Sequence, residues 1–197
     1  MPSSFQQSPA YQEVLSFHFP RYAQLPELDL YMDQVLGVVN QRLSIFAGEG
    51  EKPLTAAMVN NYVKKKLLPP AVGKRYKPSH VALLFCICTL KPVLSISEIE
   101  SLLALQYQLL PHRQAYDQFA DLLEQALHCV FASGQYDAPL LNAPPSERLV
   151  QAAIFSFANK LYVQKYLAYH AQQEQEKAEA EKEKEPPTPK KKAKAEA

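Results

Sequence analysis

The chain has 197 residues, 47% of them hydrophobic, and a formal net charge of +1 at pH 7. This length predicts one domain with an appendage, and the hydrophobic fraction is sufficient for a packed core. The chain holds 5 glycines and 16 prolines, and the prolines lie mostly between apolar stretches, which favours helices separated by breaks. Dipeptides typical of β-hairpins, such as Asn-Gly, are missing, which argues against a large sheet and predicts an all-α or nearly all-α fold.

Membrane segments and disulfides are not expected. The longest apolar run, Val81 to Cys88, is far shorter than the roughly 20 residues that span a bilayer. The N-terminus has neither a basic start nor a long apolar stretch, so no signal peptide is predicted. Three cysteines are an odd and sparse set, which argues against a disulfide framework. We therefore expect a reduced, cytoplasmic protein.

The N-terminal half is predicted to contain two helices. Residues 1–18 are expected to be weakly ordered. The helical spacing of apolar residues predicts a first helix over residues 28–46. A second helix begins after Thr55, whose side chain suits an N-cap. It ends near Leu68, because the proline pair that starts at Pro69 cannot continue a helix.

Two further helices follow a short basic loop or wing over residues 69–76. The third helix opens with Pro78 at a first-turn position and runs to about Leu90. It is apolar on every face, so we expect it to be the central buried helix. The four residues that begin at Ser95 form a capping box, which starts a fourth helix that reaches about Gln106.

The C-terminal part is predicted to contain two longer helices. The fifth runs from Pro111 to about Phe131, and the sixth from near Ser146 to at least His170. Glu-rich and Lys-rich sequence then extends the sixth helix into solvent through pairs spaced four residues apart. The last residues, rich in proline and lysine, are predicted to be disordered.

The positive charge is concentrated in one segment of the chain. Residues 51–80 hold seven basic side chains and one acidic side chain, a net charge of +6, whereas residues 1–50 have a net charge of −3. Clustered lysine and arginine are typical of surfaces that neutralise phosphates. The segment also contains the second predicted helix.

The two faces of that second helix differ. One face is apolar. The other face leaves as much room as two small side chains would, and it carries two amides and an ammonium group. Asn pairs bidentately with adenine in the major groove, so the residues predicted to read bases are Ala57, Asn60, Asn61 and Lys64. The residues predicted to contact phosphates are Thr55, Lys65, Lys66, Lys74, Arg75, Tyr76 and Lys77. A solvated surface helix with lysines for solubility is the alternative interpretation.

Residues 54–103 resemble the winged helix-turn-helix of MerR-type regulators. The matching residues are Tyr62 with Leu67, Leu68 and Pro69, then Arg75 and Tyr76 at the end of the wing, and the helix start from Leu94 to Ile99. With the preceding segment included, residues 19–105 are similar to the uncharacterised bacterial YkrK-like family. The resemblance implies an all-α fold in which a MerR-like winged helix-turn-helix is followed by a C-terminal helical module, with duplex DNA as the partner.

Three positions depart from the MerR pattern. MerR-type recognition helices usually have an Arg and a Tyr where this chain has Asn60 and Asn61, and a Gly where it has Lys66; their wing is also longer. The expected domains are a weakly ordered N-terminus over 1–18, a MerR-like helix-turn-helix domain over 19–107, a C-terminal helical module for dimerisation or sensing over 108–173, and a charged low-complexity tail over 174–197.

No residue set suits catalysis, a metal or a cofactor. Cys86 and Cys88 point in different directions on a helix, and no second ligand pair has zinc spacing, so both are expected to be small buried hydrophobes. His128 and Cys129 lack an orienting group, and His112 suits a solvated helix start. The sequence has no Gly-rich phosphate loop, no HExxH and no G-x-S-x-G. We therefore expect no enzyme activity.

The sixth predicted helix is rich in aromatic residues, namely Phe155, Phe157, Tyr162, Tyr166 and Tyr169. These residues suit the protein core or a dimer interface. They also suit a ligand pocket, because MerR-type proteins commonly sense ligands with their C-terminal part. We expect a homodimer, with a small-molecule or protein effector at the C-terminal helices. Two functions follow: a sequence-specific DNA-binding transcriptional regulator, or a helical protein-interaction adaptor whose MerR-like domain does not bind DNA.

Overall fold

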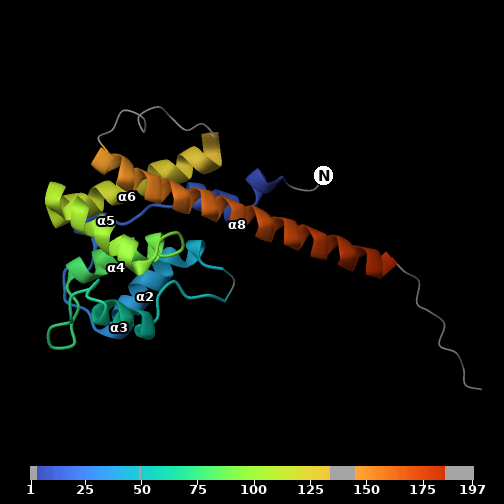
Figure 1. Cartoon of the computed structure of the whole chain (residues 1–197). Coiled ribbons are helices and arrows are strands. Elements are labelled where there is room, and N and C mark those ends of the chain that lie inside the picture. The colour runs from blue at the N-terminus through green and yellow to red at the C-terminus, as the bar shows by residue number, and fades with distance from the viewer. Residues whose placement is uncertain (1–3, 49, 134–144, 185–197) are drawn as a thin grey trace, which may run out of the picture.

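Helices dominate the computed structural model, which describes residues 4–48, 50–133 and 145–184 (Figure 1). Within these ranges no extended strand occurs, only two isolated β-bridges. The mostly helical fold predicted from composition is therefore confirmed. The predicted loop over 134–144 and the end of the predicted tail, 185–197, lie outside the described residues.

The helices form layers around α4. The elements in chain order are η1 (Phe5–Gln7), α1 (Pro9–Leu15), η2 (Tyr22–Gln24), α2 (Met32–Leu43), η3 (Ser44–Phe46), α3 (Ala56–Lys64), α4 (Pro78–Leu90), α5 (Ile96–Leu109), α6 (His112–His128), η4 (Cys129–Ser133) and α8 (Pro145–Lys184). Figure 1 shows α2 and α3 on one side of α4 and α6 and α8 on the other. Helix α4 packs against α2, α6 and α8.

Helix α4 is the buried centre of the fold, as its sequence predicts. Pro78 occupies its first turn, and the helix ends at Leu90. The amide of Lys77 donates a hydrogen bond to Nδ1 of His80 over 2.9 Å, which satisfies one of the free N–H groups at the helix start. The buried side chains lie on all faces: His80, Val81, Ala82, Leu84, Phe85, Cys86, Ile87, Thr89 and Leu90.

Residues 4–18 are ordered and packed, contrary to the prediction of a weakly ordered segment over residues 1–18. Ser8 caps α1, whose Tyr11 and Val14 are buried. The Tyr11 hydroxyl donates a hydrogen bond to the carbonyl of Phe131, and Phe5 packs edge-on against Tyr162. These contacts join residues more than 100 positions apart, so they leave no local sequence pattern.

Helix α2 begins later than the predicted helix over residues 28–46. Leu30 exchanges two backbone hydrogen bonds with Tyr76, over 2.9 and 2.8 Å, which holds the residues before α2 extended. Tyr31 is then the N-cap of α2, and its amide donates to Oε1 of Gln34 over 2.9 Å. The start of α2 is therefore decided by pairing with the segment that precedes α4.

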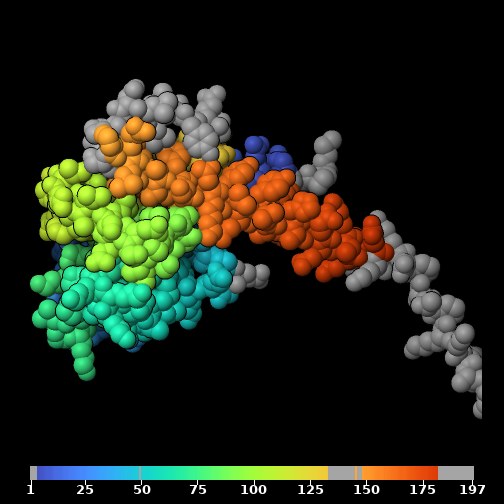
Figure 2. Space-filling view, viewed as in Figure 1, coloured from blue at the N-terminus to red at the C-terminus, as the bar shows by residue number. Residues whose placement is uncertain are grey.

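Helix α8 extends beyond His170, as the Glu-rich and Lys-rich sequence predicts. It continues past His170 to Lys184, and its last turns project from the body of the molecule (Figure 2). Lys177 pairs with Glu174 over 3.0 Å, one of the exposed pairs that support an isolated helix. In the described part of the chain, no helix is both long and apolar enough to cross a membrane.

Candidate nucleic-acid interface

Helix α3 is positioned by its N-terminal cap and by its apolar face. Thr55 Oγ1 accepts a hydrogen bond from the amide of Met58 over 3.3 Å, so the predicted N-cap is confirmed. Val59 and Tyr62 are buried and fix the inner face of the helix. The opposite face is free to meet a partner.

A side chain of α2 holds the start of α3, and sequence reasoning missed it. The side-chain Nδ2 of Asn40 donates a hydrogen bond to the carbonyl of Leu54 over 2.9 Å, and its Oδ1 accepts one from the backbone amide of Leu54 over 2.8 Å. Leu54 itself is fully buried. The paired hydrogen bonds set the distance between α2 and α3, and no local pattern in the sequence reveals a contact across 14 residues.

Helix α3 ends at Lys64 rather than near Leu68, because a backbone turn closes it earlier. Lys66 is in the left-handed conformation, with φ of 60°. Its amide donates to the carbonyl of Val63, and the amide of Leu67 donates to the carbonyl of Tyr62, both over 3.0 Å. This pattern is a Schellman motif, in which the left-handed residue is usually glycine.

The basic segment after α3 forms a minimal hairpin. Val72 and Arg75 exchange backbone hydrogen bonds of 3.1 and 3.0 Å. The two residues between them, Gly73 and Lys74, have φ of 57° and 62°, as a type I′ turn requires. The sequence gives no clear signal of this hairpin, because Gly-Lys is not among the dipeptides usual in two-residue β-hairpin loops. In Figure 1 the hairpin lies at the lower left, next to α3.

The predicted base-reading residues lie together on the outer face of α3. Ala57, Asn60, Asn61 and Lys64 are all exposed. Most of the predicted phosphate contacts are exposed too, namely Lys65, Lys66, Lys74, Arg75 and Lys77, while Thr55 is half-buried. Among the ion pairs between described residues, none involves a cation of this set. The outer face of α3 and the hairpin next to it (Figure 1) thus expose amides and positive charge that has no ion-pair partner among the described residues.

Tyr76 is the exception among the predicted phosphate contacts. Its residue is only 6% exposed, and its ring packs edge-on against His80, with ring centroids 5.7 Å apart. Burial raises the pKa of the Tyr76 hydroxyl. Tyr76 is therefore a core residue that anchors the hairpin through its backbone bonds to Leu30.

Arg75 has an intramolecular partner that the sequence did not indicate. Its guanidinium carbon lies 4.6 Å from the centroid of the Tyr31 ring, and Nη2 donates to the Tyr31 hydroxyl over 2.9 Å. Tyr31 is 49% exposed. Two apolar residues three positions away in the chain, Leu28 before Tyr31 and Val72 before Arg75, are also largely exposed.

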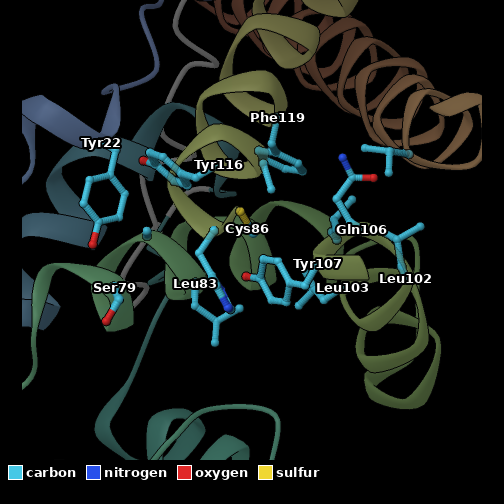
Figure 3. Close-up of a pocket in the computed structure, with 15 residues that line it drawn as sticks. Tyr22, Ser79, Leu83, Cys86, Leu102, Leu103, Gln106, Tyr107, Tyr116 and Phe119 are labelled. Carbon is cyan, nitrogen blue, oxygen red and sulfur yellow. The ribbon is translucent and has the colours of Figure 1, made fainter. Parts of the chain in front are cut away.

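The other candidate sites offer less. A cavity of about 40 Å³ lies between α4, α5 and α6 and includes Cys86, Tyr107 and Tyr116 (Figure 3). An engineered cavity that holds benzene measures about 150 Å³, so this one does not admit a ring-sized ligand in the observed conformation. Burial raises the pKa of the Cys86 thiol and that of Cys88, the latter to about 12, which keeps both in the unreactive thiol form.

The aromatic residues of α8 contact the N-terminal segment. Phe5 lies between Tyr166 and Tyr169, with ring centroids 5.2 and 5.6 Å away. Phe157 packs edge-on against Phe46. Phe157 therefore belongs to the core, while Tyr166 covers Phe5 and is itself 46% exposed. The described residues hold no cluster of three or more His, Cys, Asp or Glu side chains that suits a metal ion.

A second surface of the molecule is apolar. The exposed large hydrophobic residues outside the hairpin region lie on α5 and α8: Leu105, Leu109, Leu149, Val163, Tyr166 and Leu167. Between the two helices runs an open groove of about 510 Å³, lined by leucine, alanine and serine side chains and by Glu98. Exposed apolar side chains can serve protein association.

A protein-family model described as "Domain of unknown function (DUF1836)" matches residues 20–119. The match covers more than half of the chain, and the protein belongs to this family. The matched region runs from the segment before α2 into α6 and includes the whole basic surface. No curated protein and no solved structure matches the chain.

Proposed function

We propose that the protein is a sequence-specific duplex-DNA-binding transcriptional regulator of MerR-like type, with α3 as recognition helix and the hairpin over 72–75 as wing. The observation that carries the proposal is the surface on which Asn60 and Asn61 face solvent among cations without carboxylate partners. Asparagine amides can read base edges, and the surrounding ammonium groups can neutralise phosphates.

The backbone conformation of two lysines supports the proposal. In the described part of the chain, Lys66 and Lys74 are the non-glycine residues with positive φ. A left-handed residue with a side chain costs about 1 kcal/mol or more relative to glycine. Lysine at both positions favours a role for the ammonium groups themselves. The left-handed Lys66 also stands where MerR-type proteins have glycine, which supports the resemblance.

The proposal includes a homodimer in the cytoplasm of a bacterial cell. The exposed apolar residues of α5 and α8 suit a second copy of the chain. A symmetric dimer would present two recognition helices to two half-sites about 34 Å apart on the duplex. An effector that binds the C-terminal helices would then act through the dimer.

The experiment that tests the proposal is selection of bound sequences from a pool of random duplexes, with purified full-length protein. We expect one recurrent motif, and an affinity whose logarithm falls with the logarithm of the salt concentration at a slope of about −3 to −4.5 per subunit. That slope corresponds to roughly 3–5 neutralised phosphates. No binding at low salt, or binding without a motif, would contradict sequence-specific recognition.

The alternative is a helical adaptor that does not bind DNA. The observation that favours it is the apolar surface of α5 and α8, which fits a protein partner as well as a second copy. The two functions are separated by the same selection, because an adaptor gives neither a motif nor a salt-dependent duplex complex.

A further inference from the structure

Tyr31 and Arg75 form an opposed pair across the contact between two segments. Leu30 and Tyr76 are joined by two backbone hydrogen bonds in antiparallel orientation. The next residue along one segment, Tyr31, therefore faces the preceding residue of the other, Arg75. Directly opposed side chains in such a pair are close enough to interact.

Both ends of this pair are held by the backbone. Tyr31 is the N-cap of α2, where its amide bonds to Gln34 and its carbonyl accepts from Val35. Arg75 closes the type I′ hairpin through its two bonds to Val72. The positions of the two side chains are thus set by hydrogen bonds that do not involve them.

The geometry orders the guanidinium group. Its carbon lies 4.6 Å from the centroid of the Tyr31 ring, and its Nη2 donates to the Tyr31 hydroxyl over 2.9 Å. An unattached arginine loses much side-chain freedom when it binds a phosphate, whereas a stacked one has lost part of it already. The N–H groups that do not face Tyr31 remain available for a planar, bidentate contact with phosphate oxygens.

We infer that Tyr31 is a positioning residue of the DNA interface, which holds Arg75 for a backbone phosphate next to the hairpin. The inference rests on the proposed function. A cation–π contact at an exposed site changes an equilibrium constant by about two- to fivefold. Loss of the Tyr31 side chain therefore weakens duplex binding by about that factor, and only while Arg75 is present.

The test is a double-mutant cycle on the full-length protein, with a pool of labelled random-sequence duplexes as the probe. We expect Tyr31→Ala to weaken binding about two- to fivefold, and to have no effect when Arg75→Ala is already present. Tyr31→Phe keeps the ring beneath the guanidinium and is expected to retain most of the affinity. Thermal unfolding of each variant shows that the fold is intact.

Arg113→Ala is the matched control, since Arg113 also stacks on a tyrosine, at 4.8 Å from the ring of Tyr22, but belongs to α6 and is not among the predicted base or phosphate contacts. It is expected to leave DNA affinity unchanged. If the unchanged protein does not bind the pool, the proposed function and this inference fall together. If it binds and Tyr31→Ala binds equally well, or if the effects of Tyr31→Ala and Arg75→Ala simply add, the inference alone is overturned.

Discussion

Helix α3 and the hairpin after it direct amides and ammonium groups into solvent, whereas α5 and α8 expose leucine, valine and tyrosine side chains. The first region is held in place by specific hydrogen bonds, such as those of the Asn40 side chain to Leu54 and those of the Leu30 and Val72 backbone. The second consists of regular helix whose apolar stripe has no cover among the described residues of the chain. This difference underlies the proposal made above, in which the polar surface binds duplex DNA with defined geometry and the apolar surface is buried by a second copy or another protein.

The largest expected effect concerns the core beneath the polar surface. Tyr62 is 2% exposed, and burial raises its pKa to about 12. Tyr62→Ala is expected to lower the free energy of unfolding by about 3–5 kcal/mol, because it leaves a cavity under α3. Urea denaturation measures the loss. Asn61→Ala, one residue away on the outer face, should change stability by less than about 0.5 kcal/mol, and equal losses in the two variants would show that the faces are wrongly assigned.

The next prediction tests the apolar region. Leu167→Glu places a charge on the stripe of α8, where Leu167 is 62% exposed. If two copies bury this stripe, each loses about 1.5–3 kcal/mol of apolar burial, and light scattering should show a shift from dimer to monomer. The control is Leu28→Glu, on the hairpin side, where Leu28 is 80% exposed. A wild-type protein that is monomeric at tens of micromolar would contradict a homodimer.

Base recognition is expected to depend on the asparagine pair. Asn60→Ala or Asn61→Ala should weaken binding to the selected motif by about 1–3 kcal/mol and relax base choice at one position. Lys65→Ala should instead weaken all duplexes alike and lessen the salt slope by about one unit. Competition binding with mutated motifs distinguishes the two patterns. If both asparagine variants keep the affinity and the base preference of the unchanged protein, the two asparagines are solvated surface residues and do not read bases.

We expect the stability of the protein to depend on pH through His80, at the base of the hairpin. Nδ1 of His80 accepts the Lys77 amide, and burial lowers the pKa of His80 from 6.5. The unfolded chain therefore binds this proton more readily than the folded protein, so stability should fall as pH decreases below about 6.5, by at most about 1.4 kcal/mol per unit. This decrease in stability ends once the pH is below the lowered pKa of His80 in the folded protein.

Urea unfolding between pH 7.5 and pH 5.5 measures this fall, and His80→Gln is the variant that should flatten it. Equal slopes in the variant and the unchanged protein would show that other groups cause the pH dependence.

The smallest effect is expected at a left-handed lysine. Lys66→Gly should raise the free energy of unfolding by up to about 1 kcal/mol, because glycine adopts this conformation without a steric penalty. The same variant should weaken duplex binding, since it removes an ammonium group from the interface. Thermal unfolding and a salt titration measure the two changes. A gain in stability without any loss of affinity would show that the Lys66 charge has no part in binding.

Local patterns in the sequence determined several elements of this protein. Thr55 as N-cap, Pro78 in a first turn and the capping box from Ser95 are each confirmed, because such signals act within four residues of the backbone. The apolar residues on every face of α4 likewise required a central position. The exposed face of α3 followed from its helical periodicity.

Only the tertiary structure decided the contacts between distant segments. The packing of Phe5 and Tyr11 depends on contacts with η4 and α8, and the burial of Tyr76 depends on its pairing with Leu30. The start of α2, the clamp of Asn40 on Leu54 and the stacking of Arg75 on Tyr31 arise in the same way. The physical reason is that each is stabilised by a partner 14 or more residues away, and a single sequence does not show which distant residues will meet.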